Sequence, residues 1–329
     1  MENKSLNKNL HAAKNSKKDE FYTQLSDIEK ELKHYKDHFK GKVVLCNCDD
    51  PRVSNFFHYF SYNFETLGLK KLITTCYKNQ NRDLFSEHDS ERAIYLEYTG
   101  DKDGNKVPDP EEIGIIPLKG DGDFRSDECI ELLKSADIVV TNPPFSLFRE
   151  YVAQLAKYDK KFLIIGNINA ISYKECFELI KENKMWLGSN TTRHFAKPDG
   201  SMYETARSFW YTNLDTAKRH EELILFKKYN PNEYPQYDNY DAIEVSKAVE
   251  MPKDYDGVMG VPITFLDKYN PAQFEILGIT DRGNEWGLKT KEYTLSDVSN
   301  PGDLNRRAAI KTGDTYKATY ARLLIKKKG

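Results

Sequence analysis

The chain has 329 residues, with 49 Lys and Arg against 51 Asp and Glu, and 39% of its residues are hydrophobic. These proportions exclude a disordered or fibrous chain. No run approaches the roughly 18 apolar residues that a membrane span needs, and the first residues lack the apolar core of a signal peptide. Five cysteines are too few and too unevenly placed for a disulfide framework. We therefore expect a soluble, cytoplasmic protein with two domains.

The charges are distributed unevenly along the chain. Residues 1–18 contain five Lys and one Glu, and residues 302–329 contain eight Lys or Arg and two Asp. Between them, residues 231–256 contain seven acidic side chains and two Lys. A polyanion would therefore meet a localised positive surface rather than the whole molecule. Charge alone leaves two interpretations open, nucleic acid binding and solvated basic tails.

The first predicted elements are a helix and a β-α unit. A helix is expected near residues 27–40, opened by a capping box in which Glu29 follows Ser26. The apolar run 42–48 is too short for a helix and rich in strand formers. A turn at residues 49–51 then leads into a further helical stretch.

Strands and helices alternate as far as about residue 215. This alternation predicts an α/β fold with a mostly parallel sheet wrapped on both faces. Residues 82–117 interrupt the rhythm, because two apolar runs flank the polar stretch Gly100–Lys106, which is typical of an inserted hairpin. Beyond residue 215, clusters of Tyr, Asn, Asp and Pro predict a second, smaller and irregular domain. The expected strands lie at 71–77, 137–141 and 162–166, and the expected helices after Ser126, over 147–155 and after Ser172.

The strongest motif is the tetrapeptide Asn142-Pro143-Pro144-Phe145, which directly follows the buried-strand pattern of residues 136–141. In an open parallel sheet the ligand crevice lies at the carboxyl ends of strands, and the tetrapeptide falls at such an end. Two consecutive prolines fix the backbone there. A stiff turn after a strand is one interpretation, and a catalytic loop is the other.

The catalytic interpretation has a chemical reason. An exocyclic amine conjugated into a ring is a poor nucleophile, because its lone pair is delocalised. The Asn142 side-chain oxygen and the Pro143 carbonyl can accept both of its N–H bonds and favour a pyramidal nitrogen. Phe145 offers a flat apolar face on which a flipped-out base can stack. We therefore predict that Asn142, Pro143, Pro144 and Phe145 are catalytic.

At this motif, and over most of its length, the chain resembles the EcoRI-type adenine-specific DNA methyltransferases. The resemblance implies a Rossmann-like S-adenosylmethionine-dependent methyltransferase sheet, followed by an irregular C-terminal target-recognition domain. It implies S-adenosylmethionine as the methyl donor and N6 of adenine in double-stranded DNA as the acceptor. We predict a basic arm at 1–18, a catalytic domain at 19–220 and a recognition domain at 221–329. The segments that carry the resemblance include KSKKDEFYTQ, CNCDDPRVSNFF, GDGDFRS, DIVVTNPPFSLFREY, KYDKKFLIIGN, YDNYDAI and GVMGVPITFL.

The resemblance also implies which residues bind the donor. Three segments take part: one borders the methionine part, one ends the first strand, and one contacts the adenine. In the last segment a carboxylate can accept from the amine and a ring can stack, although a helix N-cap and a core Phe are alternatives. The second segment lacks the Gly-x-Gly turn usual in methyltransferases. The segment at the methionine part is Phe21, Tyr22 and Thr23. The segment that ends the first strand is Asp49 and Asp50, and the segment at the adenine is Asp123 and Phe124.

Other residues leave their roles open. Trp210 and Tyr211, on an expected late strand, could form a second wall of the base pocket or lie buried in the sheet. His34 and His38 are four residues apart, but no further ligands accompany them, and methyl transfer from an activated sulfonium needs no metal. We therefore expect no metal.

The sequence predicts a site-specific DNA adenine N6-methyltransferase, the modification half of a restriction-modification system. Its expected partners are double-stranded DNA and a restriction endonuclease acting on the same site, with no membrane, and the protein is expected to be a monomer. The alternatives are an N-methyltransferase of protein glutamine, of guanine or of RNA, and a catalytically silent DNA-binding module. A basic and aromatic mixture near the C-terminus is typical of a surface that meets phosphates and bases, with a solvated tail as the alternative, and it does not assign individual base contacts. Its residues are Arg306, Arg307, Lys311, Tyr316, Lys317 and Tyr320.

Overall fold

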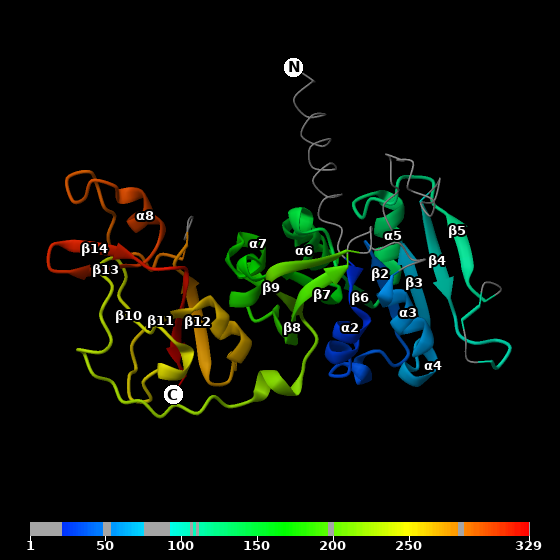
Figure 1. Ribbon diagram of the computed structural model, residues 1–329, viewed down its shortest axis with the longest axis horizontal. Coiled ribbons are helices and arrows are strands. Elements are labelled where there is room, and N and C mark those ends of the chain that lie inside the picture. The colour runs from blue at the N-terminus through cyan, green and yellow to red at the C-terminus, as the bar shows by residue number, and fades with distance from the viewer. Residues whose placement is uncertain are drawn as a thin grey trace, which may run out of the picture. The chain divides into compact units, whose positions relative to one another are not determined.

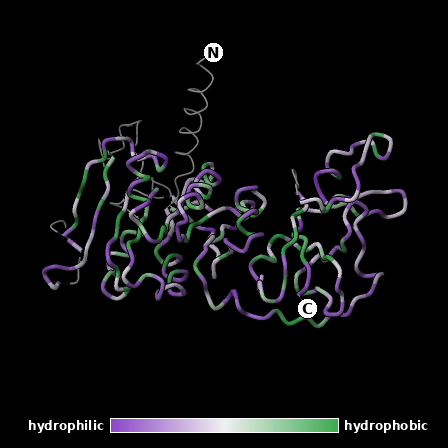
Figure 2. Tube along the Cα trace, turned by 180° about the vertical axis from the view of Figure 1, so that it is seen from behind, coloured by the Kyte–Doolittle hydropathy of each residue, from purple (hydrophilic) through white to green (hydrophobic). Residues whose placement is uncertain are grey.

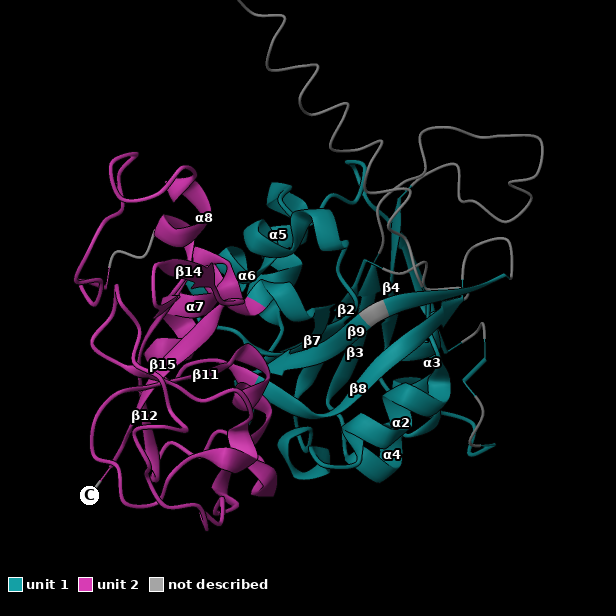
Figure 3. Ribbon diagram, turned by 60° about the vertical axis from the view of Figure 1, so that its left-hand side comes forward, with its two compact units in different colours: residues 1–170, 187–215 teal, residues 171–186, 216–329 magenta. Residues whose placement is uncertain are grey.

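The computed structural model describes residues 22–48, 54–75, 93–105, 108–109, 112–196, 201–281 and 286–328. The predicted arm at 1–18 and the site residues Phe21, Asp49 and Asp50 lie outside the described residues. The chain forms two compact units, one from residues 1–170 and 187–215 and the other from residues 171–186 and 216–329 (Figure 3). Among the described residues, no helix combines the length and apolar character needed to cross a bilayer.

A nine-stranded sheet forms the centre of the first unit (Figure 1). Its strand order is β1-β8-β9-β7-β6-β2-β3-β4-β5. The middle strands β7, β6, β2 and β3 are parallel, whereas the pairs β1–β8, β7–β9, β3–β4 and β4–β5 are antiparallel. The predicted α/β class is confirmed, and parallel pairing is concentrated at the centre of the sheet. The strands are β1 (Tyr22–Thr23), β2 (Val43–Asn47), β3 (Lys71–Thr75), β4 (Ile94–Tyr98), β5 (Gly114–Pro117), β6 (Ile138–Thr141), β7 (Lys161–Asn167), β8 (Trp186–Ala196) and β9 (Met202–Thr212).

Helices cover both faces of this sheet, with α2, α3 and α4 on one face and α5 and α6 on the other (Figures 1 and 3). The hydroxyl of Ser54 caps α3, and that of Ser126 caps α5, as their polar side chains favour. The helices and 3₁₀ helices are α2 (Leu25–Leu32), η1 (Lys36–His38), α3 (Asn55–Tyr62), α4 (Phe64–Leu67), α5 (Asp127–Ser135), η2 (Phe145–Leu147), α6 (Phe148–Lys157) and η3 (Ile168–Ser172).

The first predicted helix is shorter than expected, and its predicted capping box is wrong. The N-cap of α2 is Gln24, so Ser26 lies inside the first turn, and the regular helix ends at Leu32 rather than near residue 40. Tyr35 and Phe39 nevertheless bury their rings completely. The apolar periodicity therefore predicted the buried residues correctly. It overestimated the helix because the same spacing continues through a turn and the 3₁₀ helix η1, which lack regular α-helical hydrogen bonds.

The parallel strands are buried along almost their whole length, and hydrophobic residues gather along the inner strands and helices (Figure 2). At their carboxyl ends, however, all four carry a polar residue: Asn47, Thr75, Thr141 and Asn167. These ends share one edge of the sheet, because the four strands run in the same direction. The chain order reverses there between β2 and β6, which is where open α/β sheets bind ligands.

The insertion predicted within residues 82–117 is confirmed as a hairpin at the edge of the sheet. Strand β4 pairs antiparallel with β3 on one side and with β5 on the other. The loop between β4 and β5 contains the polar stretch that begins at Gly100.

The second unit contains a four-stranded sheet of order β10-β11-β15-β12 and a separate β13–β14 hairpin. A buried ion pair supports this sheet, in which Arg322 donates to both carboxylate oxygens of Glu244 and the hydroxyl of Tyr237 donates to the same carboxylate. Its elements are α7 (Lys174–Lys181), η4 (Ala217–His220), β10 (Ile243–Glu244), η5 (Ala248–Glu250), β11 (Met259–Pro262), η6 (Ile263–Lys268), β12 (Phe274–Ile279), α8 (Pro301–Arg306), β13 (Ala309–Thr312), β14 (Thr315–Ala318) and β15 (Arg322–Lys327).

Candidate active site

A side-chain hydrogen bond joins the carboxyl ends of β2 and β6 at the point where the strand order reverses. The Thr141 hydroxyl, the last of β6, donates to the backbone oxygen of Asn47 at the end of β2. The Tyr151 hydroxyl of α6 donates to the side-chain oxygen of the same Asn47. Burial raises the pKa of Tyr151 well above its usual value, so the hydroxyl stays protonated and remains a donor. The first bond ties the residue immediately before Asn142 to β2, and the second ties α6 to β2.

The tetrapeptide lies at the predicted place, directly after β6. Asn142 is 7% exposed and Pro143 is buried, whereas Phe145 is half-buried at the start of η2. Pro144 has an extended backbone, with φ −54° and ψ 127°, and its carbonyl accepts from the N–H of Leu147. The two prolines thus separate a buried amide from a partly exposed ring.

The predicted Tyr22-Thr23 segment and the tetrapeptide approach one another through Phe195 of β8. In the β1–β8 pair Thr23 lies opposite Phe195. The Phe195 ring meets the Phe145 ring edge-on, at 6.4 Å between centroids. The backbone oxygen of Thr23 also accepts from Asn55 Nδ2 at 2.7 Å, which ties β1 to α3. Two segments 120 residues apart in sequence therefore contribute to one region of the first unit.

Asp123 and Phe124 are held in the loop before α5. Burial raises the pKa of the Asp123 carboxyl, but hydrogen bonds and charge from Arg125 outweigh it and hold the pKa below its usual value. Oδ1 accepts from the Arg125 backbone N–H and Nε, and Oδ2 accepts from Nη2 at 2.7 Å. Since a carboxylate has about four acceptor positions, Oδ2 can accept one more hydrogen bond. The helix N-cap is Ser126, so Asp123 does not cap α5.

Phe124 connects this loop to the joined strand ends. Its ring packs edge-on against Tyr151, at 5.0 Å between centroids. Its backbone oxygen accepts from Gln154 Nε2 at 2.8 Å. The ring is also buried, at 8% exposed, with the Arg125 guanidinium 5.3 Å from its centroid. Tyr151 therefore touches both the predicted donor loop and the end of β2.

Several buried hydroxyls in this unit fit a polar ligand. The hydroxyl oxygens of Thr23, Thr74 and Thr75 are buried and have no hydrogen-bond partner among the residues that the structure describes. Thr75 is the last residue of β3 and lies beside Asn47, so its hydroxyl is at the carboxyl edge. Buried polar atoms rarely stay unpaired. The Thr75 hydroxyl at this edge is therefore a candidate partner for a polar ligand.

The late-strand aromatics lie in the core. Trp210 and Tyr211 are fully buried, with Trp210 against Phe56 and Tyr211 against Phe148. They are therefore buried strand residues rather than an open wall of a base pocket. One of the two histidines that have metal-ligand spacing is engaged elsewhere: His38 Nε2 is hydrogen-bonded to the backbone oxygen of Asp215 at 2.8 Å.

The basic residues near the C-terminus differ in how they are engaged. Arg307 bonds Asp281, and Arg306 Nε lies 3.6 Å from the same carboxylate. Lys311 and Lys317 are exposed on the β13–β14 hairpin and take part in no ion pair within the described ranges. Tyr320 is 86% exposed.

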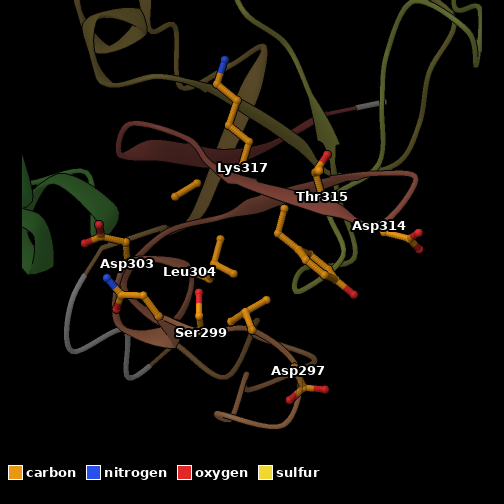
Figure 4. A pocket seen from close by; sticks show the side chains of 11 residues that line it. Asp297, Ser299, Asp303, Leu304, Asp314, Thr315 and Lys317 are labelled. Atoms are coloured by element: carbon orange, nitrogen blue, oxygen red, sulfur yellow. The ribbon is translucent and has the colours of Figure 1, made fainter.

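A cleft of about 620 Å³ lies beside this hairpin (Figure 4). Three Asp side chains and one Lys line it, so its charge does not favour phosphate. None of the predicted catalytic or donor-binding residues takes part. The charged lining residues are Asp297, Asp303, Asp314 and Lys317.

Comparison with known proteins decides the family. A family model described as adenine-specific methyltransferase EcoRI matches residues 9–328. The chain belongs to this family. It is 54% identical over 297 residues to the Type II methyltransferase M.EcoRI of Escherichia coli, covering 84% of this chain and 90% of that protein. It is 38% identical over 319 residues to the Type II methyltransferase M.MpnI of Mycoplasma pneumoniae, covering 88% and 93%. No solved structure matches the chain.

The chain is thus an adenine-specific DNA methyltransferase. Two residues that sequence reasoning missed lie at the candidate site. Asn47 and Tyr151 join the end of β2, the tetrapeptide's strand and Phe124. A polar Asn that closes an apolar run was a usable signal for Asn47. Tyr151 gave none, because it belongs to the apolar stripe of α6 and is typical of a core residue.

Proposed function

We propose that this methyltransferase transfers a methyl group from S-adenosylmethionine to N6 of an adenine flipped out of a short site in double-stranded DNA. The observation that carries this proposal is the position of Asn142-Pro143-Pro144-Phe145. The tetrapeptide follows β6 at the reversal of strand order, and the residue before it, Thr141, is hydrogen-bonded to β2 through its side chain. A buried amide and a partly exposed ring, separated by two prolines, fit an amine and its base.

The proposed chemistry rests on positioning. When bound, S-adenosylmethionine supplies a methyl group already activated on a sulfonium, so we propose that no metal takes part. The Asn142 side-chain oxygen and the Pro143 carbonyl accept the two N–H bonds of the target amine. Phe145 stacks on the extruded adenine. Because these interactions hold the amine and the base in place, most of the rate enhancement comes from orientation.

The proposed donor site combines structural and sequence arguments. Tyr22 and Thr23 on β1, with Asp123 and Phe124 in the loop before α5, are supported by their places in the first unit. The free acceptor position on Asp123 Oδ2 suits the adenine amine of the donor. Phe21, Asp49 and Asp50 are proposed on the family resemblance alone.

We propose that residues 19–220 bind the donor and transfer the methyl group, and that residues 221–329 recognise DNA, with residues 1–18 as a basic arm. The compact units divide the chain near this boundary, at residues 215 and 216, but residues 171–186 group with the second unit.

The proposed DNA contact of the second unit is the β13–β14 hairpin. A two-stranded ribbon fits the major groove. Lys311 and Lys317 are exposed on this ribbon, and Tyr320 is exposed just after it. Arg307 is engaged with Asp281, which makes it part of the support of the hairpin rather than a contact.

The biological setting is proposed from the relatives, which are named Type II methyltransferases. We propose that the chain acts as a monomer and protects DNA against a restriction endonuclease with the same recognition site.

Sequencing of native DNA from a methylation-deficient host that expresses the chain tests the proposal directly. We expect N6-methyladenine in one short motif, and none in a host that expresses Asn142→Ala. Methylated adenine without a motif would contradict site specificity. No methylated adenine, from a folded protein that binds the donor, would contradict the proposed substrate and favour protein or RNA.

A further inference from the structure

A loop that the proposed methyl transfer does not use carries a dense group of carboxylates. Between β4 and β5, ligand oxygens from Asp101, Asp103 and Glu112 all lie within 4.8 Å of one another. Within the described part of the chain, no other group of three or more His, Cys, Asp or Glu side chains is so close. Like charges at this separation repel one another unless something neutralises them.

Glu112 is the residue that points to a ligand. Glu112 is only 6% exposed. Burying a charged carboxylate costs free energy unless partners compensate for the lost water. Its Oε1 accepts from the Lys102 backbone N–H, but its Oε2 is buried and has no hydrogen-bond partner among the described residues. Neither Glu112 nor Asp103 forms an ion pair in those residues. A buried acceptor in a group of negative charges therefore lacks a counter-charge.

The same carboxylates act on a neighbouring tyrosine. Burial, and next the charges of Glu112 and Asp101, raise the pKa of Tyr98 to about 12. Tyr98 is the last residue of β4, so it lies at the entrance of the loop.

The sequence spacing matches that of a calcium loop. Asp101, Asp103 and Asn105 occupy the first, third and fifth positions, and Glu112 occupies the twelfth. Asp109 falls on the ninth position, which also supplies a ligand in such loops. The sixth position departs from the pattern, because Lys106 stands where these loops have Gly.

We propose that Asp101, Asp103 and Glu112 bind one calcium ion, with Asn105 and Asp109 as further oxygen ligands. An all-oxygen set with several carboxylates is typical of a hard cation. Calcium accepts about six to eight oxygen ligands in irregular geometry, whereas magnesium requires near-octahedral geometry, so calcium fits this set better. The ion is structural, since it joins the two ends of the β4–β5 loop. This inference does not depend on the proposed methyl transfer.

Titration calorimetry of the chelator-treated full chain with calcium chloride alone tests the site. We expect one calcium per chain, with a dissociation constant on the order of 10⁻⁴ to 10⁻³ M, because the Lys at the sixth position makes this loop less suited than a sensor loop. Calcium should also raise the Tm. The variants are Glu112→Gln and Asp103→Asn, and Glu131→Gln, an exposed carboxylate on α5, is the control.

Each result decides the proposal. At least about tenfold weaker binding in Glu112→Gln and in Asp103→Asn, with binding retained in Glu131→Gln, supports it. Asp103 is exposed, so this variant remains informative if Glu112→Gln fails to fold. No heat and no change in Tm with the wild type at about 10 mM calcium would overturn it. Equal binding by all variants would place the ion elsewhere and overturn it as well.

Discussion

At the scale of single residues, the proposed chemistry depends most on Asn142, which accepts one N–H bond of the target amine. We expect Asn142→Ala to lower turnover by about 10²- to 10³-fold, because one preoriented acceptor of the target amine is lost. Donor affinity should stay nearly unchanged, since Asn142 is proposed to touch the acceptor base only. Single-turnover methylation and donor titration separate the two quantities.

The matched comparison is Asn142→Asp, which keeps an acceptor oxygen at the same position and should lose less activity than the alanine variant. A parallel loss of donor binding in Asn142→Ala would show that the side chain has a different role.

Phe145 is expected to act on base capture. Its ring is half-buried and packs edge-on against Phe195, and we propose that its exposed part stacks on the extruded base. Phe145→Ala should weaken capture by about 1–3 kcal/mol, the usual value of base–aromatic stacking, whereas Phe145→Tyr should retain it. Fluorescence of 2-aminopurine at the target position measures extrusion directly. Wild-type fluorescence and kinetics in Phe145→Ala would rule out stacking.

At the scale of elements, a buried carboxylate joins α2 to β8. Glu31 is fully buried and accepts hydrogen bonds from the Tyr35 hydroxyl and from the backbone N–H groups of Ser189 and Asn190, all at 2.7 Å. The neighbouring Gly188 has no room for a side chain, because a Cβ there would collide with Glu31. The carboxylate and the glycine therefore form one close contact between helix and strand.

Replacing this carboxylate should destabilise the first unit. We expect Glu31→Ala to lower the free energy of unfolding by about 2–4 kcal/mol, since several buried donors lose their acceptor. Glu29→Ala, an exposed position on the same helix, should change it by less than about 0.5 kcal/mol. Urea unfolding of both variants makes the comparison. Equal effects would mean that the helix, rather than the carboxylate, determines the stability.

The β13–β14 hairpin gives a prediction for DNA binding. Each phosphate contact contributes about 0.9 to the slope of log affinity against log salt. Replacing Lys311 and Lys317 by Ala should therefore reduce the slope by about 1.8. Lys247→Ala is the control, because Lys247 is exposed but pairs with Glu250. An unchanged slope in the double variant would exclude the hairpin as a phosphate contact.

At the scale of the whole molecule, stability should fall in acid. In the second unit, hydrogen bonds from Lys291 and next from Tyr293 hold the pKa of Asp238 below its usual value of 3.8. The same sign holds for Asp123 in the first unit. A carboxyl with a lowered pKa in the folded state contributes stability above its unfolded pKa, and the contribution is lost as the pH falls through the folded value.

We therefore expect the Tm to be steady near neutral pH and to drop below about pH 4. Asp238→Asn should have a lower Tm at pH 7 and a shallower acid drop than the wild type. Calorimetric scans across this range measure both curves. Curves that run parallel at every pH would show that Asp238 does not contribute to the acid transition.

Sequence patterns predicted the class of the fold and the place of the tetrapeptide, because buried strands and proline turns are local signals. The end of α2 was not predictable in this way, since Tyr35 and Phe39 remain buried beyond the last regular turn. The bonds of Asn47 and Tyr151 join residues 104 positions apart, and only the packed sheet brings them together. Arg307 likewise looked free in sequence but bonds Asp281.

The path of the chain between the two units limits how such enzymes can be recombined. Residues 171–186, including α7, group with the second unit, and the chain then returns to the first unit for residues 187–215. Phe177 and Lys181 of α7 both pack against Trp286. A chimaera of two relatives joined once near residue 220 would combine α7 of one protein with the Trp286 region of the other, so α7 would lose its own packing partner. Exchange of the second unit between relatives therefore requires residues 171–186 and the C-terminal segment to be transplanted together.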